Sequence, residues 1–331
     1  MSSGRISAKY SRRSSVREHD LPDVVANPEE LLSLLVRMRD PQAGIRPENH
    51  WSRFFGYYSR SFRGSDVVDF ISNTLKVSRQ EAVRVANALL QQFFIHHVAG
   101  GTELLDDENE FYRYLDDGVS EYALNARIYT FTPPPTVDAL CLSVEGALTE
   151  LYHGIVGEED GLVNYDALIQ SKGFIQLLSI VPSLQRFDMR TLPEDAKLAL
   201  FVNLYNALFL QGVVELRDGH VPGESMQFTT FTRQCSYVIS GVEISLHDMV
   251  QGILRANSKS DGLSRCHFGA QDWRAHCCAE ELNPNFHFAI SYGTQSGPPL
   301  RVYHRDNITS ELEAAAASFL RRTTIFDEEE D

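Results

Sequence analysis

The longest apolar stretch of the chain, residues 198–214 (LALFVNLYNALFLQGVV), constrains the fold more than any other segment. It falls short of the roughly 18 uninterrupted apolar residues that a membrane span needs, and Asn203, Asn206 and Gln211 interrupt it. A helix that is apolar on all sides must be covered by other elements, and its buried amides need hydrogen-bond partners. The stretch therefore predicts a buried helix at the centre of a domain. Thr191 to Glu194 have the spacing of a capping box, which predicts the start of that helix.

The chain ends differ in charge from the rest of the sequence. Residues 1–27 carry five Lys/Arg against three Asp/Glu, whereas residues 326–331 form an acidic tail. Both segments lack apolar periodicity and are predicted to be disordered. Ser15 follows a pair of arginines, so it is a candidate phosphorylation site at which a phosphate would reverse the local charge.

The absence of targeting signals and of a basic surface indicates the cellular compartment and the class of protein. Residues 1–27 have no apolar core of a secretory signal, and Met1-Ser2 lacks the glycine that myristoylation requires. Five cysteines, an odd number, fit a reducing compartment better than a disulfide framework. The formal charge of −15 disfavours nucleic-acid binding, because phosphate neutralisation needs a basic surface. We therefore predict a cytoplasmic protein that does not bind nucleic acid, with room in its 331 residues for two or three domains.

Residues 28–116 show the pattern of a small domain that is mainly α with small β-hairpins. Capping signals open two of its helices, and an aromatic-rich stretch predicts a hairpin. The predicted elements are a helix from Pro28 to Val36, a hairpin from His50 to Phe62, helices opening at Gly64–Asp66 and at Ser78–Glu81, and a closing hairpin of Leu104-Leu105 with Phe111–Tyr114.

This stretch resembles the DEP domain, a signalling module named after Dishevelled, Egl-10 and Pleckstrin. The resemblance rests on Trp51, Phe62–Phe70 (FRGSDVVDF), Phe94–His97 and Phe111–Tyr114, in that order. It implies a winged-helix-like fold over residues 28–116. It also implies binding to acidic lipids or to a receptor tail or other signalling protein.

Basic and aromatic side chains alternate near the predicted hairpin. This composition suits an anionic membrane surface, where each cation near the lipid contributes about 1 kcal/mol. Residues 28–116 nevertheless carry ten Lys/Arg against thirteen Asp/Glu, so membrane contact must be local or aided by a partner. In the alternative interpretation, several of the aromatics simply cover the core. The predicted membrane- or partner-binding residues are Trp51, Arg53, Arg60 and Arg63.

A second domain is predicted beyond a linker, residues 117–135, that ends in Thr132–Pro135. Helical patterns dominate residues 136–325, which predicts a helix-rich α+β domain with a small antiparallel sheet. The predicted helices are Val137–Ile155, Tyr165–Ile180, the buried helix, one from Ser245 to Leu254 and Ser310–Arg322; the predicted strands are Tyr237–Ile239, Val242–Ile244, His287–Ser291 and Leu300–His304.

Residues 136–325 resemble the family catalogued as domain of unknown function 547. The motifs that carry the resemblance are Phe201–Leu208, Ile244–Asp248, Gly252–Arg255 and His287–Ala289 with Pro298–Tyr303. The family pattern places cysteines at Gly297 and near Tyr292, and a Glu-His pair at Val250-Gln251. A thiolate beside a histidine is an activated nucleophile, so the pattern implies thiol-hydrolase-like chemistry. Because this chain lacks the thiol, we predict a catalytically silent domain.

Two interpretations remain for the polar groups of the second domain. Asn203 and Asn206, with Tyr205 beside them, either brace neighbouring loops or line a ligand pocket. His287 and Ser296 are the candidate catalytic residues if the domain is a hydrolase or transferase of thiol-hydrolase-like ancestry. In the main hypothesis the protein is an intracellular signalling adaptor or scaffold.

Histidine and cysteine also cluster at Cys266-His267 and His276–Cys278. Adjacent ligands point apart, unlike the spaced pairs of zinc sites, and no phosphate-binding loop or dinucleotide fingerprint occurs. We therefore predict neither a metal nor a cofactor.

Overall fold

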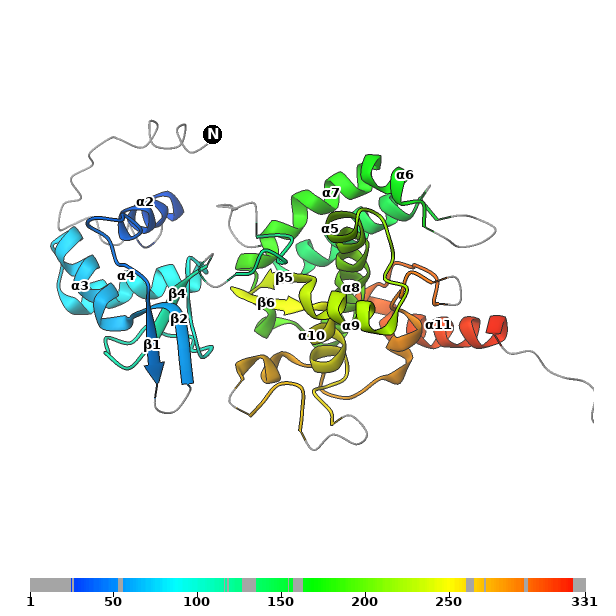
Figure 1. The fold of residues 1–331 in the computed structure, drawn as a ribbon. Helices are drawn as coiled ribbons and strands as arrows, with labels where there is room; N and C mark the ends of the chain where they lie inside the picture. The colour runs from blue at the N-terminus through cyan, green and yellow to red at the C-terminus, as the bar shows by residue number, and fades with distance from the viewer. Residues whose placement is uncertain are drawn as a thin grey trace, which may run out of the picture. The chain divides into compact units, whose positions relative to one another are not determined.

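The computed structural model describes most of the chain and divides it into two compact units (Figure 1). The described residues of the first unit end at Asp117, and those of the second begin at Val119. Three predicted site residues, Ser15, Arg53 and Ser296, lie outside the described residues. The described ranges are 25, 27–52, 56–115, 117, 119–126, 135–153, 155–156, 163–259, 265–270, 272–294 and 297–323.

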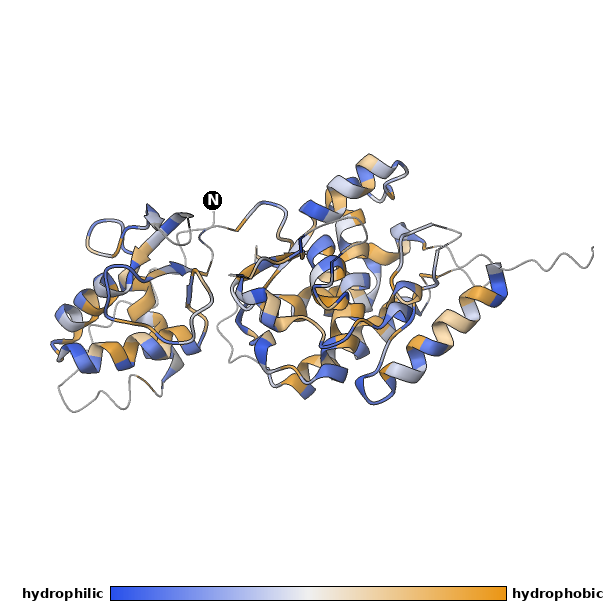
Figure 2. Ribbon diagram, turned by 90° about the horizontal axis from the view of Figure 1, so that it is seen from below, coloured by the Kyte–Doolittle hydropathy of each residue, from blue (hydrophilic) through white to orange (hydrophobic). Residues whose placement is uncertain are grey.

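The first unit packs helices against a four-stranded antiparallel sheet with strand order β1-β2-β4-β3. Its elements are α2 (Pro28–Met38), β1 (Glu48–Ser52), β2 (Gly56–Arg63), α3 (Gly64–Leu75), α4 (Arg79–Gln91), β3 (Ile95–His97) and β4 (Phe111–Tyr114). Apolar and hydrophilic residues alternate along the helices, and the apolar ones form one core (Figure 2). This arrangement confirms the predicted winged-helix-like fold and the hairpin near His50.

Local capping explains where the helices of the first unit begin. Ser78 N–H donates to Glu81 Oε2 at 2.9 Å and Glu81 N–H donates to Ser78 Oγ at 3.3 Å, which is the predicted capping box. Arg63 takes the N-cap position of α3, and its N–H donates to Asp66 Oδ2 at 3.1 Å. Gly64 is needed at this start, because an added Cβ would lie 2.0 Å from the carbonyl oxygen of Leu105.

The predicted pairing of Leu104-Leu105 with Phe111–Tyr114 is wrong. β4 pairs with β3 and β2 instead, with Ile95 opposite Tyr114 and Phe62 opposite Tyr112. The backbone N–H groups that a strand would pair are bonded to side chains instead. Leu104 N–H donates to Asn87 Oδ1 at 2.8 Å, and Leu105 N–H donates to Tyr112 Oη at 2.9 Å.

The second unit is helix-rich, and α8 (Glu194–Arg217) is its central element (Figure 1). Residues from Ala196 to Val213 are all buried, as the apolar stretch predicts. By length and apolarity α8 could cross a membrane, but 89% of its apolar window is buried inside the unit, as in a core helix. The other elements are α5 (Val137–Tyr152), α6 (Tyr165–Gln170), α7 (Lys172–Ile180), η1 (Val181–Arg186), η2 (Met189–Thr191), α9 (Ser225–Gln234), β5 (Ser236–Ile239), β6 (Val242–Ser245), α10 (Leu246–Asp248), the π-helix η3 (Met249–Leu254), η4 (Trp273–Cys277), η5 (Pro284–Phe288), η6 (Arg305–Asn307) and α11 (Ile308–Thr323).

Helix starts in the second unit differ from prediction at two places. The expected helix from Tyr165 to Ile180 is broken at Ser171, whose hydroxyl accepts from Phe174 N–H at 3.1 Å and caps α7. The capping box expected at Thr191 is absent: Pro193 is the N-cap of α8, and the Thr191 hydroxyl donates to Asp188 O at 2.8 Å. A proline N-cap offers no side-chain acceptor, so Glu194 and Asp195 in the first turn complement the helix dipole instead.

The predicted strands His287–Ser291 and Leu300–His304 are wrong. Residues 284–288 form the 3₁₀ helix η5, and residues 300–304 are not paired in a sheet. Among the described residues of this unit, the sheet is the β5–β6 hairpin with its predicted turn at Ser240-Gly241. In these segments, backbone groups form hydrogen bonds with side chains of α8 rather than with another strand.

Part of the predicted linker packs on the second unit. Leu124 N–H donates to Ser236 O at 3.0 Å, and Ser236 N–H donates to Tyr122 O at 3.2 Å. The Asn125 side chain is buried and donates to Val181 O and Val238 O, both at 2.9 Å. Residues 119–126 therefore lie beside β5 and belong to the second unit. The predicted limits of the arm, linker and tail stay predictions, because part or all of each segment lies outside the described residues.

Candidate functional site

The β1–β2 hairpin sorts its aromatic side chains between two faces. His50 lies opposite Tyr58 in the register, and both rings pack on Phe111, with centroid distances of 4.7 and 5.8 Å. The next pair, Trp51 opposite Tyr57, is 75% and 60% exposed. Because neighbouring residues of a strand point to opposite faces, the hairpin keeps one aromatic pair in the unit and presents the other to solvent.

A β-bulge turns the chain at the base of this hairpin. The register shifts between Glu48 and His50, and Arg60 adopts a left-handed φ of 48°. Its N–H donates to Asn49 Oδ1 at 3.1 Å, which holds the bulge. The Arg60 guanidinium forms an ion pair with Asp117, whose side chain is only 2% exposed. The bulge thus anchors one cation of the hairpin while leaving its side chain 63% exposed.

Two cations share this corner of the first unit. Arg113 donates to Ser59 O at 2.8 Å, and burial lowers its pKa, with Arg60 adding to the effect and Asp117 opposing it. Two guanidinium groups beside one carboxylate leave a local excess of positive charge. Arg63 lies further along β2, exposed, and forms no ion pair with the described residues.

In the second unit, α8 holds the segment around residues 289–303 through two asparagines. Asn206 donates to Ala289 O at 3.0 Å and accepts from Ser291 N–H at 2.8 Å. Asn203 donates to Tyr303 O at 2.7 Å and accepts from Tyr303 N–H at 3.0 Å. Each carboxamide therefore uses its donor and its acceptor on loop backbone, which is the geometry of a brace.

Tyr205 points into the core rather than into a pocket. Its side chain is 1% exposed and stacks on Phe209 at a centroid distance of 6.4 Å. Burial raises the pKa of its hydroxyl well above the usual value. The phenol is therefore neutral at any physiological pH.

His287 lies half-buried in η5, next to Phe286 and an arginine. Its Nε2 is 3.5 Å from Arg255 Nη1, and burial together with Arg255 lowers its pKa. A histidine with a lowered pKa beside a guanidinium is a weak base. Its predicted partner Ser296 lies outside the described residues.

Family models match both units. Residues 44–114 match the domain found in Dishevelled, Egl-10, and Pleckstrin (DEP), and residues 189–320 match the protein of unknown function DUF547. The chain contains a DEP domain followed by a DUF547 domain. No curated protein matches the chain. The DEP match includes the whole β1–β2 hairpin, and the DUF547 match includes α8, Arg255, His287 and Gly297.

The DUF547 domain also contains an Asp-His pair that the sequence does not reveal. Asp248 accepts from His267 Nε2 at 2.7 Å and from the Ser245 N–H and hydroxyl at 3.0 and 2.8 Å. Burial favours the neutral acid, but these hydrogen bonds outweigh it and lower the pKa of Asp248 to about 2. Ser245 and Asp248 have the spacing of a capping box, whereas nothing in the sequence points to the loop residue His267 as a partner.

Two adjacent cysteines of the DUF547 domain, Cys277 and Cys278, are buried and poorly suited to nucleophilic chemistry. Burial raises the pKa of Cys277 to about 11 and that of Cys278 to about 12, so both remain thiols at neutral pH. Gly297, at the family cysteine position, accepts from Arg322 through its carbonyl oxygen at 2.5 Å. Within the described ranges, no three His, Cys, Asp or Glu side chains are placed to hold a metal ion.

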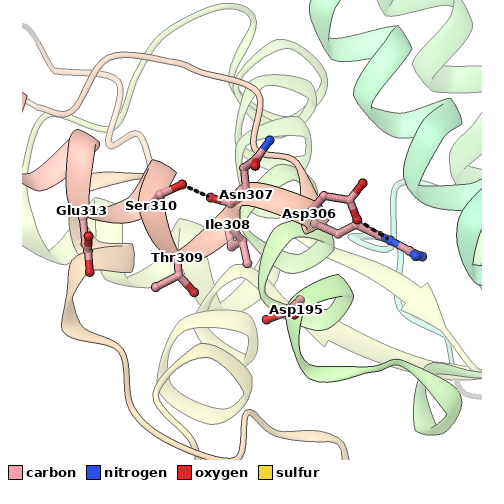
Figure 3. Close-up of a pocket in the computed structure, with 8 residues that line it drawn as sticks. Asp195, Asp306, Asn307, Ile308, Thr309, Ser310 and Glu313 are labelled. Atoms are coloured by element: carbon pink, nitrogen blue, oxygen red, sulfur yellow. Dashed lines mark hydrogen bonds and ion pairs between the residues drawn. The ribbon is translucent and has the colours of Figure 1, made fainter.

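A pocket of about 270 Å³ lies between the first turns of α8 and α11 (Figure 3). Arg305 reaches from its wall to Asp138 and Asp306. Three carboxylates against one guanidinium make its lining acidic, and none of the predicted site residues contributes to it. Its lining residues are Asp195, Arg305, Asp306, Asn307, Ile308, Thr309, Ser310 and Glu313.

Proposed function

We propose that this protein is an intracellular signalling adaptor whose DEP domain docks on an acidic phospholipid surface through the β1–β2 hairpin. The observation that carries the proposal is the exposed cross-strand pair of Trp51 and Tyr57, with Arg60 and Arg63 further along β2. Amphipathic aromatic rings favour the boundary between lipid and water. The presence of a DEP domain itself indicates signalling or docking at a membrane or a protein.

The charges favour a local, reversible contact. Each arginine near an anionic lipid contributes about 1 kcal/mol, and the contribution falls off within a Debye length. The net charge of −3 over residues 28–116 opposes approach of the domain as a whole to an anionic surface, so the contact must be local. Docking by the hairpin therefore supports a cytoplasmic protein that associates peripherally with membranes and dissociates at raised salt.

A vesicle-binding experiment tests the hairpin with a matched charge control. The full-length chain is sedimented with vesicles of phosphatidylcholine alone or with phosphatidylserine. We expect Arg63→Glu, and separately Trp51→Ala with Tyr57→Ala, to reduce binding at least tenfold. Arg84→Glu changes one charge on the exposed side of α4 and should have little effect.

Three outcomes would decide against this surface. Equal loss with Arg84→Glu would mean that overall charge, not the hairpin, drives binding. Equal binding to neutral vesicles would remove the role of the arginines. Binding of a signalling protein through the same residues, without vesicle binding, would favour the partner-docking alternative.

We also propose that the DUF547 domain is catalytically silent and acts as a scaffold. The support is the bracing geometry of Asn203 and Asn206, the proximity of His287 to Arg255, and the burial of the Cys277 and Cys278 thiols. The hydrolase alternative predicts turnover of an ester or thioester substrate that His287→Gln abolishes. Its detection in the full-length protein would contradict the scaffold role.

A further inference from the structure

The segment that carries Arg255 has an unusual backbone. It follows the π-helix η3, a geometry that is rare and frequently found at functional sites. The next two residues, Ala256 and Asn257, adopt left-handed φ values of 55° and 48°, which non-glycine residues rarely do in succession. Asn257 is fixed by Phe268, whose N–H donates to Asn257 Oδ1 at 2.8 Å and whose O accepts from Asn257 Nδ2 at 3.0 Å. Arg255 thus lies between the π-helix and two consecutive residues in left-handed conformation.

The polar groups of this segment are incompletely paired. Arg255 Nε is buried and finds no hydrogen-bond partner among the described residues, and the same holds for the hydroxyl of Ser258 three residues later. Arg255 Nη1 faces His287 Nε2 at 3.5 Å, a basic neighbour rather than an acceptor carboxylate. Unpaired buried donors are rare in folded proteins, so this arrangement suggests a missing acceptor.

Two other arginines of the same domain have a carboxylate partner that Arg255 lacks among the described residues. Arg274 pairs with Asp272 at 2.7 Å and Arg190 with Asp188 at 2.8 Å. Neither Arg255 nor His287 has a carboxylate within ion-pair distance in the part of the chain that the structure describes. The chain has 45 Asp and Glu against 30 Lys and Arg, so acidic residues are plentiful elsewhere.

We propose that Arg255 and His287 bind the carboxylate group of a small-molecule ligand. The guanidinium fork matches the two oxygens of a carboxylate, and the imidazole can donate a second hydrogen bond through Nε2. One cation balances one negative charge. A phosphate dianion places both of its negative charges on one group inside the half-buried site, where one cation balances only one of them, whereas each carboxylate of a ligand carries a single charge. This disfavours phosphate as the ligand.

The test uses acetate and succinate as probes on the isotope-labelled full-length protein at constant ionic strength. The His287 ring signal, assigned by its absence in His287→Gln, should shift saturably with either probe. Arg255→Gln should weaken the apparent affinity at least tenfold. Arg255→Lys keeps the charge, loses the fork and should bind more weakly than wild type, so it serves if Arg255→Gln does not fold.

Matched controls separate this site from general charge effects. Arg305→Gln removes an exposed arginine that has Asp138 and Asp306 as partners and should leave the affinity unchanged. Asp261 lies outside the described residues, so Asp261→Asn tests whether the chain supplies its own carboxylate. The proposal predicts no change for Asp261→Asn. A tenfold gain would mean that an internal ion pair fills the site.

Other results would also overturn the proposal. Saturation by inorganic phosphate but not by acetate or succinate would contradict the ligand class. A linear shift without saturation, or equal weakening by Arg305→Gln, would show that no carboxylate site exists at Arg255.

Discussion

The β1–β2 hairpin of the DEP domain and the segment from Ala289 to Tyr303 of the DUF547 domain hold their backbones in opposite ways. In the hairpin, backbone groups pair across two strands, and side chains such as Trp51 are free to face solvent. In the other segment, backbone groups at three residues pair with the carboxamides of Asn203 and Asn206. The hairpin therefore presents side chains to solvent, whereas the segment from Ala289 to Tyr303 is fixed to the core.

This difference bears on function. Backbone hydrogen bonds hold the two strands of the hairpin together, so its outward side chains are available to bind a partner or a membrane. A loop that is held by buried amides from α8 cannot move without exposing unpaired polar groups. The DEP hairpin is therefore suited to docking, and the braced loop is suited to a rigid scaffold or a preformed ligand site.

The largest expected effect comes from removing a brace. Asn206→Ala leaves Ala289 O and Ser291 N–H buried without partners, and each such group costs about 1–3 kcal/mol. We expect a loss of about 2–6 kcal/mol in the free energy of unfolding of the DUF547 domain, measured by urea denaturation. Asn307→Ala, at an exposed asparagine of the same domain, should change it by less than about 0.5 kcal/mol. Equal effects of the two variants would refute the brace.

A pair of glycine variants would test whether the two units unfold separately. An added Cβ would lie 2.0 Å from Leu105 O at Gly64 and 2.2 Å from Leu151 N at Gly173, both backbone atoms. Overpacking of this kind costs about 1–3 kcal/mol. We expect Gly64→Ala to lower protection from hydrogen exchange only in the first unit, and Gly173→Ala only in the second unit.

Gly146 supplies the control for both variants. It lies in α5, and nothing would touch an added Cβ within 4 Å. Alanine has the higher helix propensity, so Gly146→Ala should stabilise the second unit by about 0.5–1 kcal/mol. Loss of protection in both domains with either of the clashing variants would show that the units unfold together.

The sequence predicts the elements whose signals are local. The capping box at Ser78 and Glu81, the turn at Ser240-Gly241 and the apolar pattern of α8 each lie within one short segment, and all three appear in the structure. The strands predicted near His287 and Leu300 fail because their backbone partners are side chains located 83–100 residues away in the chain. The hydrophobic periodicity of a short segment carries no information about a hydrogen-bond partner that is so distant in the chain.

For the candidate site residues, too, the sequence indicates local features but not contacts between distant residues. The aromatic and basic composition near Trp51 indicates a surface, but the cross-strand pairing with Tyr57 and the Arg60–Asp117 ion pair depend on register and on contacts 57 residues apart. The role of Arg255 depends on a π-helix and two left-handed residues, for which the sequence gives no signal.

Mild acid should weaken the DEP domain through His96. This side chain is fully buried, and its pKa is lowered to about 3, mainly by burial, with contributions from Arg113 and His97. Below its unfolded pKa of about 6.5, the unfolded chain binds a proton that the folded domain does not, so stability falls as the pH falls, by about 1.4 kcal/mol per pH unit down to about pH 3. Between pH 6.5 and 5 the loss is about 2 kcal/mol, measurable by hydrogen exchange of β3 and β4.

Two histidine variants sharpen this prediction. His96→Phe removes the titrating group and should flatten the pH dependence of β3 and β4 protection. His304→Gln removes an exposed histidine of the other domain and should leave that dependence as it is. If His96→Phe keeps the full pH dependence, another group in the DEP domain must be responsible.

The smallest expected effect on stability belongs to the hairpin tip. Trp51 is 75% exposed, so Trp51→Ala removes few contacts and should change the free energy of unfolding of the DEP domain by less than about 0.5 kcal/mol. Tyr58→Ala, in the same hairpin but packed on Phe111, should cost clearly more. Urea denaturation of the two variants separates these cases. A Trp51→Ala variant that is destabilised as much as Tyr58→Ala would mean that the tryptophan supports the fold, and a loss of vesicle binding in that variant could then no longer be assigned to a lost contact with lipid.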